Sequence, residues 1–295
     1  MRKMRRTGID KLHTLLFGRD LRITEGEPYC QVRPFDFAAD FEPRHLTKPL
    51  PAPAGKVFDI RTFGADPAAE DNAVAVQQAV DAAAKVGGTV LVDGGSYPMS
   101  TVNLRSGVTL FITPGSFLAA RPDGKGFRHK ALLYGRDLTN VTLTGGGGLE
   151  GEGHRFGLRP ALPQNCTKPA DLIDVIEMRR TYRAQLRFAH PSKYGGLLCL
   201  EQCQGVHIHH FLFQNSAHWT CRLQMCRDVL VEYAAIRNNR NVANADGFDI
   251  VGGQDLTFRH CMVSTADDGF VFKHAVWLGS SGEMRHILIE DCRVD

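Results

Sequence analysis

The chain has 295 residues, enough for one large domain or two ordinary ones, and 43% of them are hydrophobic while 23% are charged. This composition excludes the disordered and collagen-like classes, and no apolar stretch approaches the roughly 18–20 residues of a membrane span. A formal net charge of +3 is too small to indicate a nucleic-acid-binding protein. The 30 glycines suit a fold with many tight turns.

The N-terminus begins with a basic segment, Met1–Arg6, but Asp10, Lys11 and His13 interrupt any apolar core of a signal peptide. We therefore expect a soluble, cytoplasmic protein, with a wrongly assigned start codon as the alternative. Residues 1–56 are mixed in polarity and end in a run rich in Pro and Ala, so we interpret them as an extension and linker. Residues 57–295 are predicted to form a single domain.

The domain opens with a predicted short strand at 57–60, followed by a loop and then a helix over residues 73–86. Asp71 or Asn72 can cap this helix, and its apolar residues lie on one face. Two glycines directly after it end the helix. It is the one helix that the sequence of this domain predicts clearly.

Everything after residue 88 is typical of short strands separated by turn residues, beginning at 89–92, 108–112 and 141–143. Four glycines at 145–148 interrupt the series. Residues 154–195 show little periodicity, and we interpret them as an excursion from the scaffold.

An internal repeat starts near residue 197. The segment Cys203–Ile208 is matched by Cys226–Val231 at an offset of 23 residues, and a second family of strands alternates with this one. Coils of about two dozen residues with one apolar face cannot bury that face alone, so they must stack into continuous parallel sheets. The predicted fold is all-β, a parallel β-helix whose open N-terminal end the helix covers.

The repeat also bears on the eight cysteines, none of which shows a CxxC or zinc-finger spacing. Cys203 and Cys226 are equivalent in adjacent coils, and Cys199 and Cys221 are nearly so, which favours stacked buried thiols over disulfides or metal ligands. The histidines at 207–210 are interpreted as partly exposed strand residues instead of a metal cluster. With no phosphate-binding loop either, we predict no metal and no cofactor.

Two later coils align at an offset of 22 residues, which places an Asp-Gly-Phe at 246–248 over another at 268–270. Adjacent strands lie about 4.8 Å apart, so the carboxylates of Asp246 and Asp268 should be close neighbours, with that of Asp267 beside them. Mutual repulsion raises at least one pKa in such a patch, and the set can hold a protonated acid beside ionised bases near neutral pH. The alternative is that each Asp-Gly only makes a turn before its strand, which leaves Asp267 unexplained.

The same two segments resemble a known family. Asn244–Ile250 (Asn-Ala-Asp-Gly-Phe-Asp-Ile) resembles the Asn-Thr-Asp-Gly-Ile-Asp signature of polygalacturonases and related pectin hydrolases, glycoside hydrolase family 28. Ala266–Lys273 resembles the family's Gly-Asp-Asp-Cys-Ile-Ala-Ile-Lys signature, and the spacing between the two aspartate motifs also fits. Weaker similarities lie at 58–90, 148–153 and 215–220.

The resemblance implies a right-handed parallel β-helix and an inverting glycosidase acting on α-linked galacturonan or a related acidic pectic polysaccharide. It makes Asp267 the general acid, and Asp246 with Asp268 the pair that holds and activates water. Such a site needs acid and base carboxyls about 6.5–9.5 Å apart. Asn244 and Lys273 match family positions and are implied to bind substrate, although Lys273 is equally explained as a solvated residue at a strand end. No nucleic-acid or membrane partner is expected.

The sequence departs from the family near its C-terminal end. The family carries a Gly-His-Gly segment about one coil after the aspartate pair and then an Arg-x-Lys pair that grips the substrate carboxylate, whereas this sequence stops at Asp295 and contains no Gly-His-Gly. An unfinished coil leaves strand edges open, so we expect either a partner or second chain over that end, or a longer protein of which this is a fragment.

Two other functions stay open from the sequence. One is a β-helix that binds carbohydrate without cleaving it, because the family's His and Arg/Lys are missing. The other is a β-helix lyase or epimerase; lyases on this fold usually work with Ca²⁺ and basic residues, and the spacing of the aspartates argues against that reaction.

Overall fold

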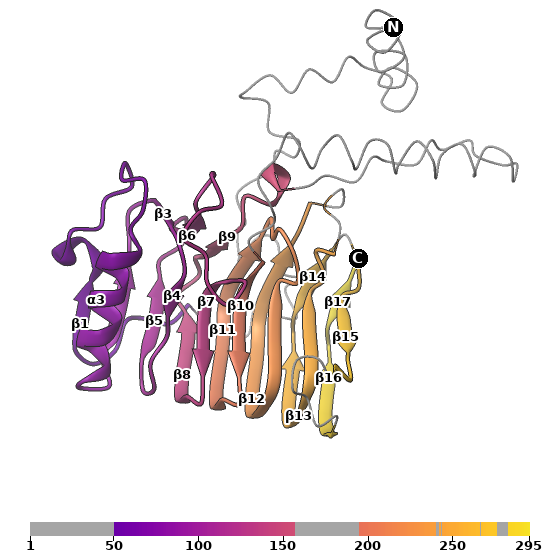
Figure 1. Cartoon of the computed structure of the whole chain (residues 1–295). Helices are drawn as coiled ribbons and strands as arrows, with labels where there is room; N and C mark the ends of the chain where they lie inside the picture. Colours follow the sequence, from indigo (N-terminus) through magenta and orange to yellow (C-terminus); the bar gives the residue numbers. More distant parts are fainter. Residues whose placement is uncertain (1–49, 157–194, 240–241, 243, 266, 276–282) are drawn as a thin grey trace, which may run out of the picture.

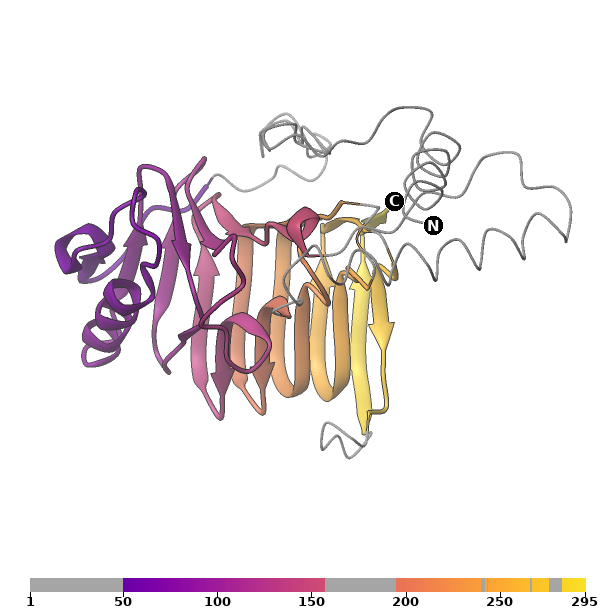
Figure 2. The same cartoon turned by 45° about the horizontal axis from the view of Figure 1, so that its top comes forward.

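The computed structural model describes residues 50–156, 195–239, 242, 244–265, 267–275 and 283–295. These residues form a right-handed parallel β-helix, in which the coils stack side by side from residue 57 to the last residue (Figures 1 and 2). The named strands pair in parallel throughout, as the sequence repeat predicts. The predicted extension at 1–56 and the predicted excursion at 154–195 lie largely outside the described residues.

The strands form three faces of the coil. The first sheet contains β4 (Val102–Asn103), β7 (Ala131–Arg136), β10 (Gly196–Glu201), the start of β12 (Cys221–Arg237), the start of β13 (Phe248–Arg259) and β15 (Phe270–Phe272). The second contains β1 (Val57–Asp59), β2 (Thr89–Val92), β5 (Thr109–Ile112), β8 (Thr139–Thr144), the start of β11 (Gln204–Gln214), the middle of β12, the end of β13 and β16 (Met284–Glu290). The third contains β3 (Ser96–Met99), β6 (Phe117–Ala120), β9 (Gly148–Glu150), the ends of β11 and β12, β14 (Met262–Ser264) and β17 (Arg293–Val294).

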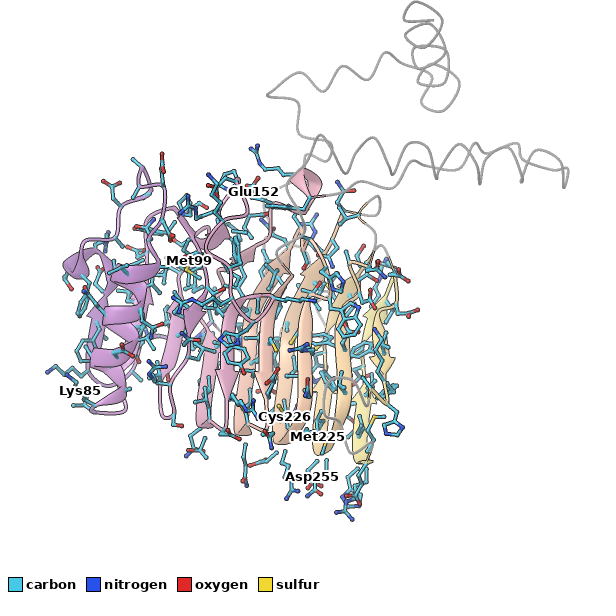
Figure 3. All side chains as sticks on the ribbon, in the orientation of Figure 1. Lys85, Met99, Glu152, Met225, Cys226 and Asp255 are labelled. Atoms are coloured by element: carbon cyan, nitrogen blue, oxygen red, sulfur yellow. The ribbon has the colours of Figure 1, made fainter. Side chains whose placement is uncertain are left out.

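Long strands such as β12 turn from one sheet into the next at residues with left-handed backbone. His210, Tyr233 and His260 have φ of 48°, 52° and 53° at equivalent corners, and their rings stack with centroids 5.0 and 4.9 Å apart. The expectation that the histidines at 207–210 are partly exposed is wrong for His210, which is buried because Tyr233 of the next coil covers it. Another corner carries Met225 and Asp255, which Figure 3 shows at the lower end of the coils.

The helix α3 (Ala73–Ala84) lies at the N-terminal end of the stack, and its buried side chains join the apolar core (Figure 1). Asn72 is the N-cap residue but makes no capping bond; instead Asp71 Oδ1 accepts a hydrogen bond of 2.9 Å from the Ala73 amide. Two short 3-10 helices, η2 (Ile60–Phe63) and η3 (Gly153–Arg155), complete the described elements. No helix in the described ranges is long and apolar enough to cross a membrane.

The cysteine positions follow the register of the coils. Cys203 and Cys226 are buried at equivalent positions, and the six cysteines that the structure describes are free thiols. The expected stacking of Cys199 with Cys221 is wrong, because Cys199 pairs in register with Arg222 while Cys221 pairs with Leu198. Since neighbouring residues of a strand point to opposite faces, Cys221 packs in the core and Cys199 lies on the outer face.

Three phenylalanines show how the later coils are held together. The Phe248 and Phe270 rings stack across adjacent coils of the first sheet with centroids 5.3 Å apart, and Phe258 from the second sheet packs against both. Phe258 is fully buried. The core at this end therefore depends on aromatic contacts between sheets as well as on the backbone ladder.

We expect Phe258→Ala to lower the free energy of unfolding by about 3–5 kcal/mol, because it leaves a cavity where a buried ring was. Denaturant unfolding followed by circular dichroism measures this. The matched control is Val74→Ala on the exposed face of α3, which should change stability by less than about 0.5 kcal/mol. Equal effects of the two variants would contradict this account of the core.

Candidate active site

Two adjacent coils of the first sheet bring the aspartates together. The amide of Gly247 donates to the carbonyl oxygen of Asp268 at 2.8 Å, and the amide of Phe248 donates to that of Gly269 at 2.9 Å. These bonds place Asp246 beside Asp268, and Asp267 precedes Asp268 on the same coil. A side chain at position 247 would come within 2.2 Å of the Gly269 oxygen, so only glycine permits this close approach.

The four aspartates of this region differ sharply in burial. Asp246 is 3% exposed and Asp249, which lies on β13, is fully buried, whereas Asp267 and Asp268 are exposed. On strand β13 the residues alternate, so that the large apolar side chains of Phe248 and Ile250 enter the core while Asp249 points to the other face. We call Asp246, Asp249, Asp267 and Asp268 the aspartate cluster.

Lys273 links the buried half of the aspartate cluster. Its backbone amide donates to the Ile250 oxygen at 2.8 Å, which fixes the residue against β13. Its ammonium lies 3.1 Å from Asp246 Oδ2, donates to Asp249 Oδ1, and sits 3.6 Å from the centre of the Trp219 ring. One positive charge thus stands between two buried carboxyl groups, so a second positive charge, in the form of a proton, is favoured on the pair.

The pKa values reflect this arrangement. Burial raises the pKa of Asp249 to about 7, against the opposing effect of its hydrogen bond with Lys273. Burial also raises the pKa of Asp246, which Lys273 lowers and the charges of Asp267 and Asp268 raise further. Burial alone would lower the pKa of Lys273, but its contacts with the two carboxylates outweigh that and raise it. The buried pair therefore binds a proton more tightly than an ordinary aspartate does, with the pKa of Asp249 raised to about 7.

A buried polar network holds the backbone of Asp246 in place. Its carbonyl oxygen accepts from the amide and hydroxyl of Thr220 at 3.0 and 2.6 Å. Asn238 donates to the Thr220 hydroxyl at 2.7 Å and to the Ala245 oxygen at 3.1 Å, and its own amide oxygen accepts from the Ser216 amide. These bonds tie the aspartate to the two preceding turns of chain, which limits its movement.

The outer face of the first sheet continues with polar and aromatic residues. Arg222 lies next to Asp249 in the ladder and donates to Glu201 at 2.7 Å and to Cys199 at 2.8 Å. Tyr134 donates to the other oxygen of Glu201 at 2.9 Å, and burial raises its pKa to about 12. The aspartate cluster thus lies at one end of a polar strip on this sheet.

The five predicted site residues are not equally placed. Asp246, Asp267 and Asp268 lie together, and Lys273 joins them by binding the buried aspartates. Asn244 is exposed on a turn with φ of 56°, and it makes no hydrogen bond to these aspartates within the part of the chain that the structure describes.

Three residues of the site were missed from the sequence: Asp249, Trp219 and Asn238. Asp249 and Trp219 stand inside segments already noted, where period-two alternation would have placed Asp249 opposite its apolar neighbours. Asn238 carries no such signal, because its role depends on contacts with residues 7 and 18 positions away.

No group of three or more His, Cys, Asp or Glu residues among those described is arranged to hold a metal ion. The outward-facing carboxyl groups, the half-buried ammonium of Lys273 and the Trp219 ring form an arrangement that can bind and release protons. Paired carboxyl groups with separated pKa values are characteristic of glycoside hydrolysis.

Comparison with known proteins agrees with a glycoside hydrolase. Residues 89–276 match the model of glycosyl hydrolases family 28, so the chain belongs to this family. A polygalacturonase of Arabidopsis thaliana, QRT2, is 23% identical in an alignment of 239 residues, and the match covers 76% of this chain and 47% of the relative. The chain therefore spans about half the length of the curated relative that it matches.

Solved structures share the fold. A glycosyl hydrolase described as putative from Parabacteroides merdae has a TM-score of 0.60 at 21% identity, over 81% of this chain and 96% of that one. The family 28 exopolygalacturonase of Yersinia enterocolitica has a TM-score of 0.61 at 19% identity, over 82% and 49%. The Erwinia carotovora polygalacturonase also gives 0.61, at 16% identity over 84% and 65%.

The raised pKa of Asp249 predicts a particular dependence of stability on pH. The folded protein keeps this proton up to about pH 7, whereas the unfolded chain releases it near 3.8, so the contribution of Asp249 to stability is complete below 3.8 and lost as the pH rises through 7. We therefore expect Asp249→Asn to gain stability relative to the native protein between pH 4 and 8. Unfolding in denaturant at several pH values measures the difference.

The control for this measurement is Asp228→Asn, the same exchange at an exposed corner residue outside the aspartate cluster. A difference between Asp249→Asn and the native protein that stays constant from pH 4 to 8 would contradict a proton held at Asp249.

Proposed function

We propose that this protein hydrolyses α-linked galacturonan or a related acidic pectic polysaccharide, with inversion at the anomeric carbon. The observation that carries the proposal is the aspartate cluster, in which two exposed carboxyl groups lie beside two buried ones that share one ammonium. Membership of glycosyl hydrolases family 28 supports the reaction type. The polygalacturonase relatives, which are distant, support the substrate class.

In the proposed reaction, Asp267 is the general acid. Its proton passes to the glycosidic oxygen as the bond from that oxygen to the anomeric carbon breaks. Its exposed position at the head of β15 suits contact with a polymer that approaches from solvent. General acid catalysis of this kind contributes about 10²–10⁴-fold to the rate.

Asp246 and Asp268 are the proposed water-activating pair. A water molecule held by them loses a proton to the pair as its oxygen attacks the anomeric carbon from the face opposite the leaving group, which inverts the configuration. The hydrogen bonds that fix Asp246, together with the ladder bond from Gly247 to Asp268, support this role because they hold the pair in one geometry.

Reducing-end release from polygalacturonate by the purified chain tests the proposal. We expect Asp267→Asn to lower kcat by about 10²–10⁴-fold while binding of the polymer, measured by calorimetry, persists. Proton NMR of the first product should show the inverted anomer. Asp255→Asn is the matched control and should keep native activity.

Other outcomes would separate the remaining functions. Polymer binding without reducing-end release, in the native chain as well as in the variants, would contradict hydrolysis and identify a binding protein. A product with a new ultraviolet absorption and a dependence on Ca²⁺ would identify a lyase and overturn the assigned roles.

A further inference from the structure

The surroundings of Lys273 decide what this residue can do. An ammonium group has three donors, and two of them are directed at Asp246 and Asp249. The Trp219 ring, centred 3.6 Å away, covers another side of the same nitrogen in a cation–π contact. The side chain is 22% exposed, so protein groups take up most of the space around the charge.

The charge balance argues against a role in gripping an acidic sugar. The single positive charge of Lys273 faces two buried carboxyl groups of the preceding coil, and the exposed Asp267 and Asp268 lie on the same coil as Lys273. A substrate carboxylate that approached Lys273 would meet a neighbourhood with more negative than positive charge. Repulsion between like charges would then oppose binding at this position.

The carboxylate oxygens of the buried pair that Lys273 does not bind support the same conclusion. Asp246 Oδ1 and Asp249 Oδ2 are buried and accept no hydrogen bond from the described residues. Two ionised carboxylates with one unsatisfied oxygen each would be costly to bury, whereas one ionised and one protonated carboxyl group can share the ammonium. Lys273 contacts both Asp246 and Asp249, so its single positive charge can balance the one negative charge that remains on the pair.

We propose that Lys273 is a positioning residue, which Trp219 holds against Asp246 and Asp249 so that one carboxyl group of this pair stays ionised beside a protonated one. Lys273 is not a ligand for the substrate carboxylate in this assignment. The inference deepens the proposed function, because the ionised member supports the water-activating pair. The proton that Asp246 and Asp249 share beside the Lys273 ammonium is present without substrate, so it can be measured without substrate.

The first test needs no substrate. Carbon-13 NMR of selectively labelled aspartate side chains follows each carboxyl group through a pH titration, with Asp246→Asn and Asp249→Asn assigning the signals. In Lys273→Met, we expect the midpoints of the buried pair to move upward by about one to three pH units, because the favourable opposite charge is gone. Lys273→Arg keeps the positive charge, so the midpoints of the buried pair should stay close to their native values. Unchanged midpoints in Lys273→Met would overturn the proposal.

The second test uses the reaction. Lys273→Met should lower kcat by roughly 10–100-fold with KM changed less than about threefold, and it should move the acid side of the pH–rate profile to higher pH. The control Lys85→Met makes the same exchange on an exposed lysine at the end of α3, far along the stack from the aspartate cluster, and should change neither (Figure 3). A KM raised tenfold or more with kcat and profile unchanged would show that Lys273 binds substrate, and would overturn the proposal.

Trp219→Leu provides a variant that keeps all charges. Loss of the ring contact should shift the same aspartate midpoints in the same direction by a smaller amount, and it serves as the deciding variant if Lys273→Met does not fold. If the native chain cleaves no polysaccharide, the proposed function fails, while the NMR titration still decides the positioning role. The two failures are therefore distinguishable.

Discussion

The parallel backbone ladder between successive coils is the constraint on which both the fold and the candidate active site depend. Each coil repeats the apolar residues of the one before it, and a slip of one residue would turn that apolar set outward. The ladder therefore fixes which residues become neighbours across the 22 positions that separate Asp246 from Asp268. The same register puts Arg222 beside Cys199 and Asp249 on the outer face. The arrangement of the candidate active site is therefore set by the stacking of the coils.

The balance of charges is a second requirement of the candidate active site. Four aspartates within two coils would repel one another, and burial of two of them would be costly, without the ammonium of Lys273 between Asp246 and Asp249. Trp219 from the preceding coil and the Asn238–Thr220 network hold these groups in position. The site is thus assembled from three coils: two supply the aspartates and Lys273, and the third supplies Trp219 and Thr220.

Much of this could be predicted from the sequence because β-helix coils leave a periodic record. The offset of 23 residues between Cys203 and Cys226 and the shared Asp-Gly-Phe predicted the stacking of coils and three of the four clustered aspartates, and the apolar pattern over 73–86 predicted the N-terminal helix. The prediction was wrong for Cys199 and Cys221, which are offset by one residue in the register and therefore lie on opposite faces of the sheet. It was also wrong for His210, whose burial depends on a ring from the next coil.

By itself, the sequence determined the parallel β-helix, its N-terminal helix and the proximity of Asp246, Asp267 and Asp268. The reason is that periodicity and motif spacing are visible along the chain itself. Only the tertiary structure decided that Asp249 belongs to the cluster, that Asn244 stays apart on its turn, and that Lys273 faces carboxylates and an indole ring. The physical reason is that the burial of a side chain and the groups it contacts depend on side chains from other coils. A strand pattern states which face a residue occupies, but the neighbours it meets there are set by the packing of the whole stack.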